Sequence, residues 1–435
     1  MEALPEAFVK RIQDTYPFAD QLIQSLDGDV PVSIQLHPTK SYQFDGKNIP
    51  WSDRGVYLPS RPQYTLDPLL HGGAFYPQEA SSMFLNHVLS SLDLEDAEIV
   101  CDLCAAPGGK SLVLHSFFQN RALVVSNEII PKRNAILREN LIKWGFSSKV
   151  ITQSDPAKFG DLPPMFDLLV IDAPCSGEGM FRKDERARQE WSEENVALCA
   201  KRQSAILDDA LPSLKDGGYL VYSTCTFAQA ENEDQVNRLV DSGEFEVVNV
   251  EVDPAWNIHQ PMDGCFQFFP HRTEGEGLFM AVLRKTGMPK GFRYPKSLPR
   301  SVTPPQQIEL PEDFVLIEME GLRALPKAAL PFVETLRKKL YIKALGTEVG
   351  EAVKHKFIPS HELALSCDIQ HNLPTLKVDR DTALAFLRKE KQRLDEPQGW
   401  YQITHQGVGL GWVKALGNRV NNYYPKAWRV LIERR

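Results

Sequence analysis

The chain has 435 residues, of which 43% are hydrophobic and 24% are charged, and its formal net charge is −8. This composition is typical of a globular protein, and the length predicts two or three domains. No run of 18 apolar residues occurs and the first ten residues lack the apolar segment of a signal peptide, so we expect a cytoplasmic protein without a membrane span. Seven cysteines, an odd number, favour reduced thiols over a disulfide framework.

The first 75 residues are expected to form a small mixed domain, with a helical pattern near residues 5–26 and short extended runs after it. Residues 76–288 are expected to form a second domain, within which residues 96–284 alternate between strand and helix patterns. This alternation predicts a mostly parallel, doubly wound α/β sheet. The expected strands are 99–103, 122–127, 149–152, 166–171, 219–223, 245–250 and 278–283, and the expected helices are 110–118, 134–143 and 195–214.

A glycine-containing loop follows the first expected strand. Gly108 and Gly109 allow the backbone to approach a ligand closely and offer free N–H groups at a helix start. The end of the loop matches the end of the phosphate-binding motif G-x-x-x-x-G-K-S/T, but Cys104 occupies the position of the first glycine that this motif requires. The dinucleotide-binding fingerprint G-x-G-x-x-G is absent from the sequence. A purely structural strand–turn–helix is the alternative. The loop consists of Cys104, Ala105, Ala106, Pro107, Gly108, Gly109, Lys110 and Ser111.

An acidic residue ends or follows each of the first four strands. Asp102 ends the first strand, and Glu128 follows the second, about 20 residues past the glycines, where an acid can bind ribose hydroxyls. Asp155 follows the third strand and is placed to meet an adenine edge, and Asp172 ends the fourth. Such acids suit a ligand with ribose and adenine but no phosphate, a description that matches S-adenosylmethionine.

Two cysteines follow neighbouring strands of the predicted sheet. Cys175 lies in Asp172-Ala173-Pro174-Cys175 and Cys225 lies in Ser223-Thr224-Cys225, so both thiols are expected to face one crevice. A thiolate that adds to carbon 6 of cytosine makes carbon 5 nucleophilic toward a methyl donor. Asp172 could stabilise a proton on ring nitrogen 3, and the second thiol could assist release.

Other cysteines are predicted to have no chemical role. A buried cysteine is often a small apolar filler, and we expect this of Cys199, Cys265 and Cys367. Cys101 and Cys104 form a C-x-x-C pair, but no second pair accompanies it, so we expect no metal site.

The C-terminal third of the chain differs in composition and charge. Residues 289–311 are rich in proline and are predicted to be a basic linker, and residues 312–435 to form a second, β-rich globular part. Residues 1–280 sum to −18 and residues 281–435 to +10, which together give −8. A basic stripe on an acidic protein suits contact with a polyanion, unless these segments are basic without function. The stripe over 281–308 contains Arg284, Lys285, Lys290, Arg293, Lys296 and Arg300 and no acid.

These motifs together resemble the Nol/Nop/Sun family of RNA cytosine carbon-5 methyltransferases, most nearly its bacterial RsmF-type members that act on 16S ribosomal RNA. The resemblance covers nearly the whole chain and rests on residues 102–110, 172–179 and 222–226. Residues 73–83, 180–184 and 191–192 are similar to adjoining segments of that group. Residues 409–414 and 418–420 resemble its C-terminal PUA-like RNA-binding domain.

The resemblance implies a Rossmann-like S-adenosylmethionine-dependent methyltransferase core with a small N-terminal domain and a PUA-like module. It implies Cys225 as nucleophile and Cys175 as the thiol that assists release. Family members often carry Arg-x-Asn in the N-terminal domain, where this chain has Gln35-Leu36-His37, so an RNA contact there is not expected. The implied cofactor contacts are Cys104 to Lys110, Glu128, Arg133, Asp155 and Asp172.

Three alternative functions are left open. A DNA cytosine methyltransferase would use Cys175 as nucleophile, but no target-recognition insertion separates the motifs. A transfer-RNA cytosine methyltransferase would share all the chemistry. A non-catalytic ribosome-assembly factor would have no need to retain both thiols and Asp172.

Overall fold

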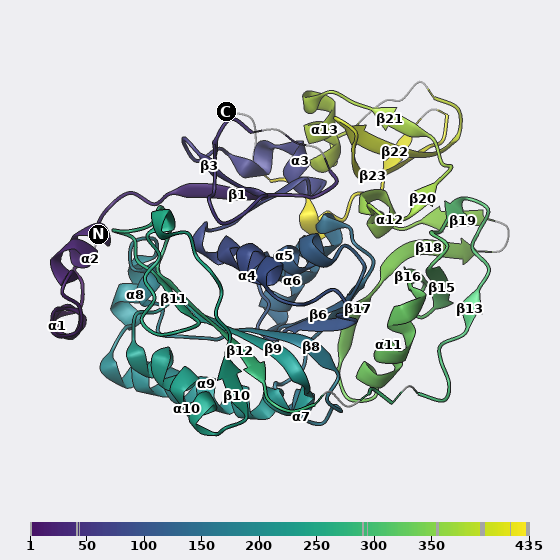
Figure 1. The fold of residues 1–435 in the computed structure, drawn as a ribbon. Coiled ribbons are helices and arrows are strands. Elements are labelled where there is room, and N and C mark those ends of the chain that lie inside the picture. Colours follow the sequence, from purple (N-terminus) through teal and green to yellow (C-terminus); the bar gives the residue numbers. More distant parts are fainter. Residues whose placement is uncertain are drawn as a thin grey trace.

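The computed structural model describes residues 2–40, 42, 44–288, 291–293, 295–353, 356–391, 396–417 and 419–431. Pro289 and Lys290 of the expected basic linker, and Asn418 of the PUA-like motif, lie outside the described residues. The chain forms a large central sheet covered by helices, a small N-terminal sheet above it, and a β-rich C-terminal part beside both (Figure 1). Within the described residues, no helix is both long and apolar enough to cross a membrane.

The central sheet confirms the expected mostly parallel α/β fold. Its strand order is β10-β12-β9-β8-β5-β6-β7-β17, with β11 paired to β12. The five strands from β9 to β7 run parallel, whereas β10, β11, β12 and β17 pair antiparallel. The strands are β5 (Ile99–Asp102), β6 (Leu123–Asn127), β7 (Lys149–Thr152), β8 (Phe166–Asp172), β9 (Leu214–Thr224), β10 (Phe245–Val247), β11 (Cys265–Phe268), β12 (Leu278–Lys285) and β17 (Ile342–Leu345).

Helices cover both faces of this sheet, so its strands are apolar at consecutive positions instead of alternating. Ile99 and Cys101 of β5 belong to the core on one face, and Val100 belongs to the core on the other. The first face carries α7 (Ala157–Gly160), α9 (Glu193–Ala210), α10 (Glu233–Asp241) and α11 (Leu330–Leu336). The second carries α4 (Leu85–Ser91) and α5 (Gly109–Phe118), with α6 (Pro131–Trp144) against α5 (Figure 1).

The strand order places a topological switch point between β5 and β8. From β5 the chain moves outward through β6 and β7, and then returns to the other side of β5 as β8 and β9. The loops after β5 and β8 therefore leave the sheet in opposite directions, and ligands of open α/β sheets bind in the crevice that this creates.

The N-terminal part consists of α1 (Glu6–Thr15), α2 (Ala19–Ser25), a 3-10 turn η1 (Tyr64–Leu66), α3 (Pro68–His71) and a sheet of order β2-β3-β1-β4. Phe8 and Ile12 of α1 pack with Phe181 and Trp191, beyond β8. The sheet strands are β1 (Val32–Leu36), β2 (Lys47–Asn48), β3 (Gly55–Leu58) and β4 (Phe75–Pro77).

The segment that departs from the family pattern is buried between domains. The Gln35 Nε2 donates to Ser116 Oγ at 3.4 Å, and His37 Nε2 lies 2.8 Å from the Trp144 carbonyl oxygen. Burial lowers the pKa of His37 well below its usual value, so the ring is neutral. Gln35 and His37 therefore join the N-terminal sheet to helices α5 and α6.

The C-terminal part shares its core with the central sheet. Strand β17 extends the central sheet beyond β7, and Phe332 and Leu336 of α11 belong to the same core as Ile99. The C-terminal part therefore packs directly on the central sheet, and the domain boundaries expected at residues 288 and 312 stay predictions. The expected linker also supplies two short strands, β13 (Ser301–Val302) and β14 (Ile308–Glu309). They pair with β15 (Phe314–Glu318) and β20 (Gln370–His371), respectively.

The rest of the C-terminal part forms two further sheets. One has the order β13-β15-β16-β18-β19, and the other has the order β21-β22-β23-β24. The elements are β15 (Phe314–Glu318), β16 (Leu322–Pro326), β18 (Thr347–Val353), β19 (Lys356–Pro359), α12 (His361–Leu365), β20 (Gln370–His371), β21 (Thr375–Lys377), α13 (Arg380–Leu387), β22 (Gly399–His405), β23 (Val408–Ala415) and β24 (Val420–Asn422).

Candidate active site

The loop after β5 is held in shape by helix α6. Gly108 has a φ of 123°, a left-handed conformation that favours glycine, and a Cβ there would come 3.3 Å from Leu137. Arg133 Nη2 donates to the Ala106 carbonyl oxygen at 2.7 Å, and Asn140 Nδ2 donates to the Pro107 carbonyl oxygen at 2.8 Å. Helix α5 begins directly after the loop, at Gly109, so the loop is fixed at both ends.

Asp102 is buried at the end of β5. Its Oδ2 accepts a hydrogen bond from Ser111 Oγ at 2.6 Å, while its buried Oδ1 has no hydrogen-bond partner among the described residues. Burial raises the pKa of this carboxyl to about 7, and the bond from Ser111 opposes that rise. One oxygen is thus left for a ligand that binds in the loop.

Glu128 lies just after β6 and its side chain is 4% exposed. Its Oε1 accepts from the Ile130 N–H at 2.8 Å, and its Oε2 lies 3.4 Å from Arg133 Nε. A carboxylate has about four acceptor positions, so two remain after these contacts. The third acid, Asp155, is exposed, and its Oδ1 accepts from the N–H of Ala157, the first residue of α7, at 3.0 Å.

A cavity of about 200 Å³ lies against the glycine loop. Its lining comes from the loop, from β4 and the segment after it, and from Asp172 and Lys183 at and beyond the end of β8. Its lining residues are Tyr76, Pro77, Gln78, Glu79, Ser82, Asp102, Cys104, Ala105, Ala106, Pro107, Gly109, Lys110, Asp172 and Lys183.

An ion pair spans the switch point. Lys110 Nζ, buried at the start of α5, lies 2.9 Å from Asp172 Oδ1 at the end of β8. Ser223 Oγ on β9 donates to the same oxygen at 2.8 Å. Burial lowers the pKa of Lys110, but the carboxylate of Asp172 outweighs this and holds that pKa above its usual value. Lys110 therefore stays charged and fixes the Asp172 carboxylate at the cavity wall.

The two predicted thiols lie next to each other. Cys175 Sγ is 3.1 Å from Cys225 Sγ, and the Cys225 N–H donates to Cys175 Sγ at 3.3 Å. The hydrogen bond to Cys225 and burial raise the pKa of Cys175 well above its usual value, so Cys175 stays protonated. Strands β8 and β9 are hydrogen-bonded neighbours, which is why two cysteines 50 positions apart meet.

Buried carboxylates that were absent from the sequence predictions support both cysteine loops. Glu231 Oε2 accepts from the Ser176 N–H at 3.0 Å and from Gln203 Nε2 at 2.9 Å. Glu178 accepts from Arg11 Nη2 at 2.5 Å and from the Phe227 N–H at 3.0 Å, which ties helix α1 to the loop after Cys225. Acidic residues are common in this region of the sequence, and only burial distinguishes these two.

Asn127 at the end of β6 was also absent from the predictions. Its Nδ2 donates to the Leu103 and Ser154 carbonyl oxygens at 3.1 and 3.0 Å, and its Oδ1 accepts from Thr152 Oγ1 at 2.8 Å. This amide thereby joins the ends of β5, β6 and β7. In the part of the chain that the structure describes, no group of three or more His, Cys, Asp or Glu residues is arranged to hold a metal ion.

The fold and the site define a Rossmann-like methyltransferase, and sequence comparison identifies its family. The family model described as 16S rRNA methyltransferase RsmB/F matches residues 89–284. Models of the N-terminal domain of 16S rRNA methyltransferase RsmF and of the methyltransferase RsmF PUA domain match residues 4–80 and 373–430. The chain belongs to this family of RsmF methyltransferases.

Individual relatives agree with this assignment. Ribosomal RNA small subunit methyltransferase F of Shewanella piezotolerans is 30% identical over 90% of this chain and 87% of its own length. The protein of the same name from Aliivibrio fischeri MJ11 is 28% identical over 97% of both chains.

Solved structures share the fold. NSun6 from Pyrococcus horikoshii, solved with SFG, has a TM-score of 0.57 and 20% identity, covering 66% of this chain and all of its own. A methyltransferase homolog protein from Pyrococcus horikoshii has a TM-score of 0.56 and 25% identity, covering 65% of this chain and 95% of its own.

Proposed function

We propose that this protein transfers a methyl group from S-adenosylmethionine to carbon 5 of a cytosine in 16S ribosomal RNA, with Cys225 as the nucleophile. The observation that carries the proposal is the 3.1 Å approach of the Cys175 and Cys225 sulfurs. Both thiols lie at the strand ends where Lys110 holds the carboxylate of Asp172.

The residues around the glycine loop fit S-adenosylmethionine. Glu128 keeps free acceptor positions for ribose hydroxyls, and the buried Oδ1 of Asp102 has no partner within the described residues. The loop from Cys104 to Gly109 offers close backbone approach, and Asp155 follows β7 and is proposed to meet the adenine edge. When bound, this cofactor supplies an electrophilic methyl group.

The residues of this chain prepare the cytosine for that methyl group. Cys225 Sγ, as thiolate, forms a bond to carbon 6, and electron density moves to carbon 5. Asp172 uses one oxygen for Lys110 and Ser223, which leaves the other to stabilise a proton on ring nitrogen 3. After methylation, a base removes the carbon 5 proton and the carbon 6–sulfur bond breaks, returning its electron pair to Cys225. Cys175, held protonated, donates to the leaving sulfur.

The C-terminal module and the basic stripe are proposed to hold flanking RNA. Lys414 Nζ lies 5.1 Å from the centre of the Trp400 ring, and the Trp400 and Tyr423 rings are 4.5 Å apart. Aromatic rings beside cations suit unpaired bases and phosphates. Arg293, Arg419 and Arg429 are exposed on the same part of the chain.

Two other basic residues expected in RNA contact have structural roles. Lys285 Nζ donates to the Leu211 and Leu214 carbonyl oxygens at 3.2 and 3.1 Å. Arg284 Nε donates to the Gly217 carbonyl oxygen at 3.1 Å, and its guanidinium lies over Tyr219. We therefore omit this pair from the proposed RNA contacts.

Covalent trapping tests the proposed roles of the thiols. Cys225→Ala is expected to abolish methyl transfer to 16S RNA while cofactor binding persists, because no carbon 6 adduct can form. Cys175→Ser is expected to trap a protein–RNA adduct on denaturing gels, because addition survives and release fails. Cys367→Ser, in the C-terminal part, is the matched control and is expected to behave like the unmodified protein.

Two results would contradict this assignment. Turnover by Cys225→Ala would exclude Cys225 as nucleophile. A trapped adduct found only in Cys225 variants would mean that Cys175 is the nucleophile and Cys225 assists release, as expected for a DNA cytosine methyltransferase.

A further inference from the structure

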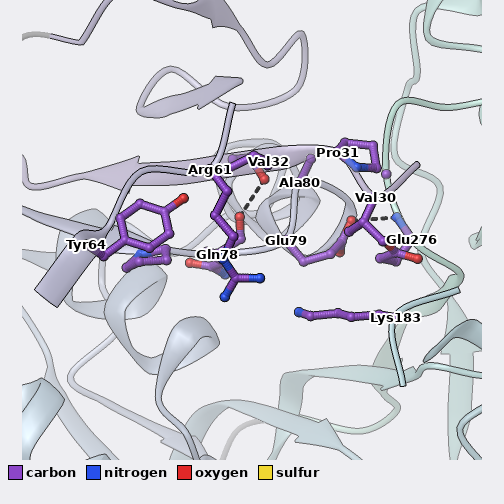
Figure 2. Close-up of a pocket in the computed structure, with 13 residues that line it drawn as sticks. Val30, Pro31, Val32, Arg61, Tyr64, Gln78, Glu79, Ala80, Lys183 and Glu276 are labelled. Atoms are coloured by element: carbon purple, nitrogen blue, oxygen red, sulfur yellow. Dashed lines mark hydrogen bonds between the residues drawn. The ribbon is translucent and has the colours of Figure 1, made fainter. Parts of the chain in front are cut away.

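A second cavity, of about 310 Å³, lies beside the one at the glycine loop. The two cavities share Pro77, Gln78, Glu79 and Lys183 in their walls. Figure 2 shows Arg61 and Tyr64 on one side of this outer cavity and Lys183 extending into it from the other. Its volume is at the lower end of the range for ligand pockets, about 300–1,000 Å³.

Gln78 lies in the wall that the two cavities share, and its side-chain amide makes no hydrogen bond within the described residues. Its side chain is buried, with the residue 8% exposed, yet neither Nε2 nor Oε1 has a hydrogen-bond partner among the described residues. The backbone is fixed, because the Gln78 N–H donates to the Ser33 carbonyl oxygen and Ser33 Oγ donates back to the Gln78 carbonyl oxygen. An unpaired buried carboxamide is costly, so it points to a ligand with a complementary donor and acceptor.

The charges in the outer cavity favour an anion. Glu79 accepts from the N–H groups of Ser81, Ser82 and Glu276, and Glu276 is paired with Arg182 at 3.2 Å. Glu276 therefore has an ion-pair partner and Glu79 has hydrogen-bond partners, so two cavity cations, Arg61 and Lys183, face the single unpaired charge of Glu79.

The two basic residues in the cavity wall lack ion-pair partners within the described residues. Arg61 and Lys183 are exposed and form no ion pair within the described ranges. Because the neighbouring acids have their own partners, a phosphate between Arg61 and Lys183 would meet two cations.

Tyr64 adds an aromatic surface to the same cavity. Its ring is half-buried and packs on Phe75 at 6.2 Å, which fixes its orientation. The adjoining Leu66 packs against the core of the C-terminal sheet, and Arg380 Nη2 donates to the Leu66 carbonyl oxygen at 3.0 Å. The outer cavity thus lies between the site of chemistry and the C-terminal module.

We propose that the outer cavity is a subsite for an RNA nucleotide that neighbours the target cytosine. Its phosphate lies between Arg61 and Lys183, its base lies against Tyr64, and the Gln78 carboxamide hydrogen-bonds the base edge. A carboxamide offers donors and an acceptor together, as recognition of an unpaired base requires. This inference rests on the proposed RNA methylation.

The phosphate contact is tested with the full-length chain and a 16S RNA transcript. The double variant Arg61→Ala/Lys183→Ala is expected to raise the RNA dissociation constant about tenfold. In a plot of the logarithm of this constant against the logarithm of the salt concentration, the slope should fall by about one. The single variant Arg61→Ala, whose residue lines the outer cavity but not the glycine-loop cavity, should leave the cofactor dissociation constant unchanged. The control Lys201→Ala/Arg202→Ala removes the same charge from exposed positions on α9. Equal RNA affinity and slope in both variants would overturn the phosphate contact.

The base contact is tested with Gln78→Met, which keeps the side-chain size and removes the carboxamide. The methylated cytosine is first mapped with the unmodified protein, and each flanking nucleotide is then changed. Gln78→Met should lose about fivefold or more of the discrimination at one flanking position, while its melting temperature stays equal or rises. Unchanged discrimination would overturn the subsite.

Two controls separate this inference from the proposed function. A transcript containing 4-thiouridine beside the mapped cytosine should crosslink to the peptide that contains Tyr64, and crosslinking only elsewhere would contradict the subsite. If the unmodified protein transfers no methyl group to the transcript or to assembled small subunits, the proposed function itself fails and the subsite fails with it.

Discussion

Glu231 accepts two hydrogen bonds from Ser176, one from the backbone N–H at 3.0 Å and one from Oγ at 2.5 Å. Ser176 follows Cys175 directly, and its Oγ also lies 2.9 Å from Thr226 Oγ1, directly after Cys225. Burial raises the pKa of Glu231. One carboxylate therefore sets the relative position of the two thiol-bearing loops.

Replacing Glu231 should impair release of the product. Glu231→Ala leaves the donors of Ser176 and Gln203 unpaired, at about 1–3 kcal/mol each, so we expect a lower melting temperature. Glu231→Gln keeps one acceptor and should fold, yet turn over more slowly and accumulate the covalent RNA adduct. Calorimetry and denaturing gels measure the two effects. Glu233→Gln, on the neighbouring helix α10, is the control. A Glu231→Gln protein with normal turnover would show that this carboxylate has no part in positioning.

Lys110 is predicted to act on the chemistry more than on cofactor affinity, because its amine contacts Asp172. Lys110→Met should lower kcat by about 100-fold, the scale of losing one preorganised charged contact, and should change the cofactor dissociation constant little. Single-turnover kinetics and calorimetry separate the two quantities. The opposite pattern, weak cofactor binding with normal kcat, would assign Lys110 to the cofactor alone.

Glu128 is predicted to bind the ribose. Glu128→Ala should weaken S-adenosylmethionine binding about 5- to 150-fold, because a buried hydroxyl pair that loses its acceptor costs about 1–3 kcal/mol. Arg133→Ala removes the partner of Glu128 at 3.4 Å but keeps the acceptor, so its effect should be smaller. Isothermal titration calorimetry measures both. Unchanged affinity in Glu128→Ala would place the ribose elsewhere.

Asp102 is predicted to make stability depend on pH. Its pKa is about 7 in the folded protein, against about 3.9 for an unperturbed aspartate. The folded state therefore holds the extra proton between these values, and the contribution of Asp102 to stability falls as pH rises from about 4 to 7. The loss amounts to at most about 4 kcal/mol.

Urea unfolding of Asp102→Asn and the unmodified protein at several pH values measures this contribution. The stability of Asp102→Asn relative to the unmodified protein should increase from pH 4 to 7 and level off above. Asp155→Asn, which changes an exposed acid in the same way, is the control for the substitution itself. A difference between Asp102→Asn and the unmodified protein that is constant with pH would mean that Asp102 is ionised throughout.

The C-terminal module is predicted to bind RNA without selecting the cytosine. Removing residues 289–435 would also remove β17 and the α11 side chains of the shared core, so point variants are the better test. Lys414→Ala/Arg419→Ala/Arg429→Ala should weaken RNA binding and flatten its salt dependence, with the same cytosine methylated. Filter binding at several salt concentrations and mapping of methylated positions check this. A change of the methylated cytosine would show that the module selects the target.

From the sequence we could predict most strands of the central sheet, three of its helices and the polar residues at the strand ends. Local patterns carry this information: strands β5, β6, β7 and β8 lie within one or two residues of the expected ranges. The strands of a parallel sheet that is buried on both faces consist of consecutive apolar residues. The residues that follow these strands lie at the carboxyl edge of the sheet, where ligands bind. That is why Asp102, Asp172, Cys175 and Cys225 were predicted as site residues from the chain itself.

The distant residues that complete the site could be identified only from the packed chain. The Gln78 amide, the Glu231 carboxylate and the role of β17 depend on contacts between segments far apart in the chain. An acid such as Glu231 has the sequence pattern of a solvated helix start. It becomes a support because it is buried beside α9 and β9, where Gln203 donates to its carboxylate and Tyr222 donates to its carbonyl oxygen. Burial and pairing are properties of the packed chain, so no local pattern contains them.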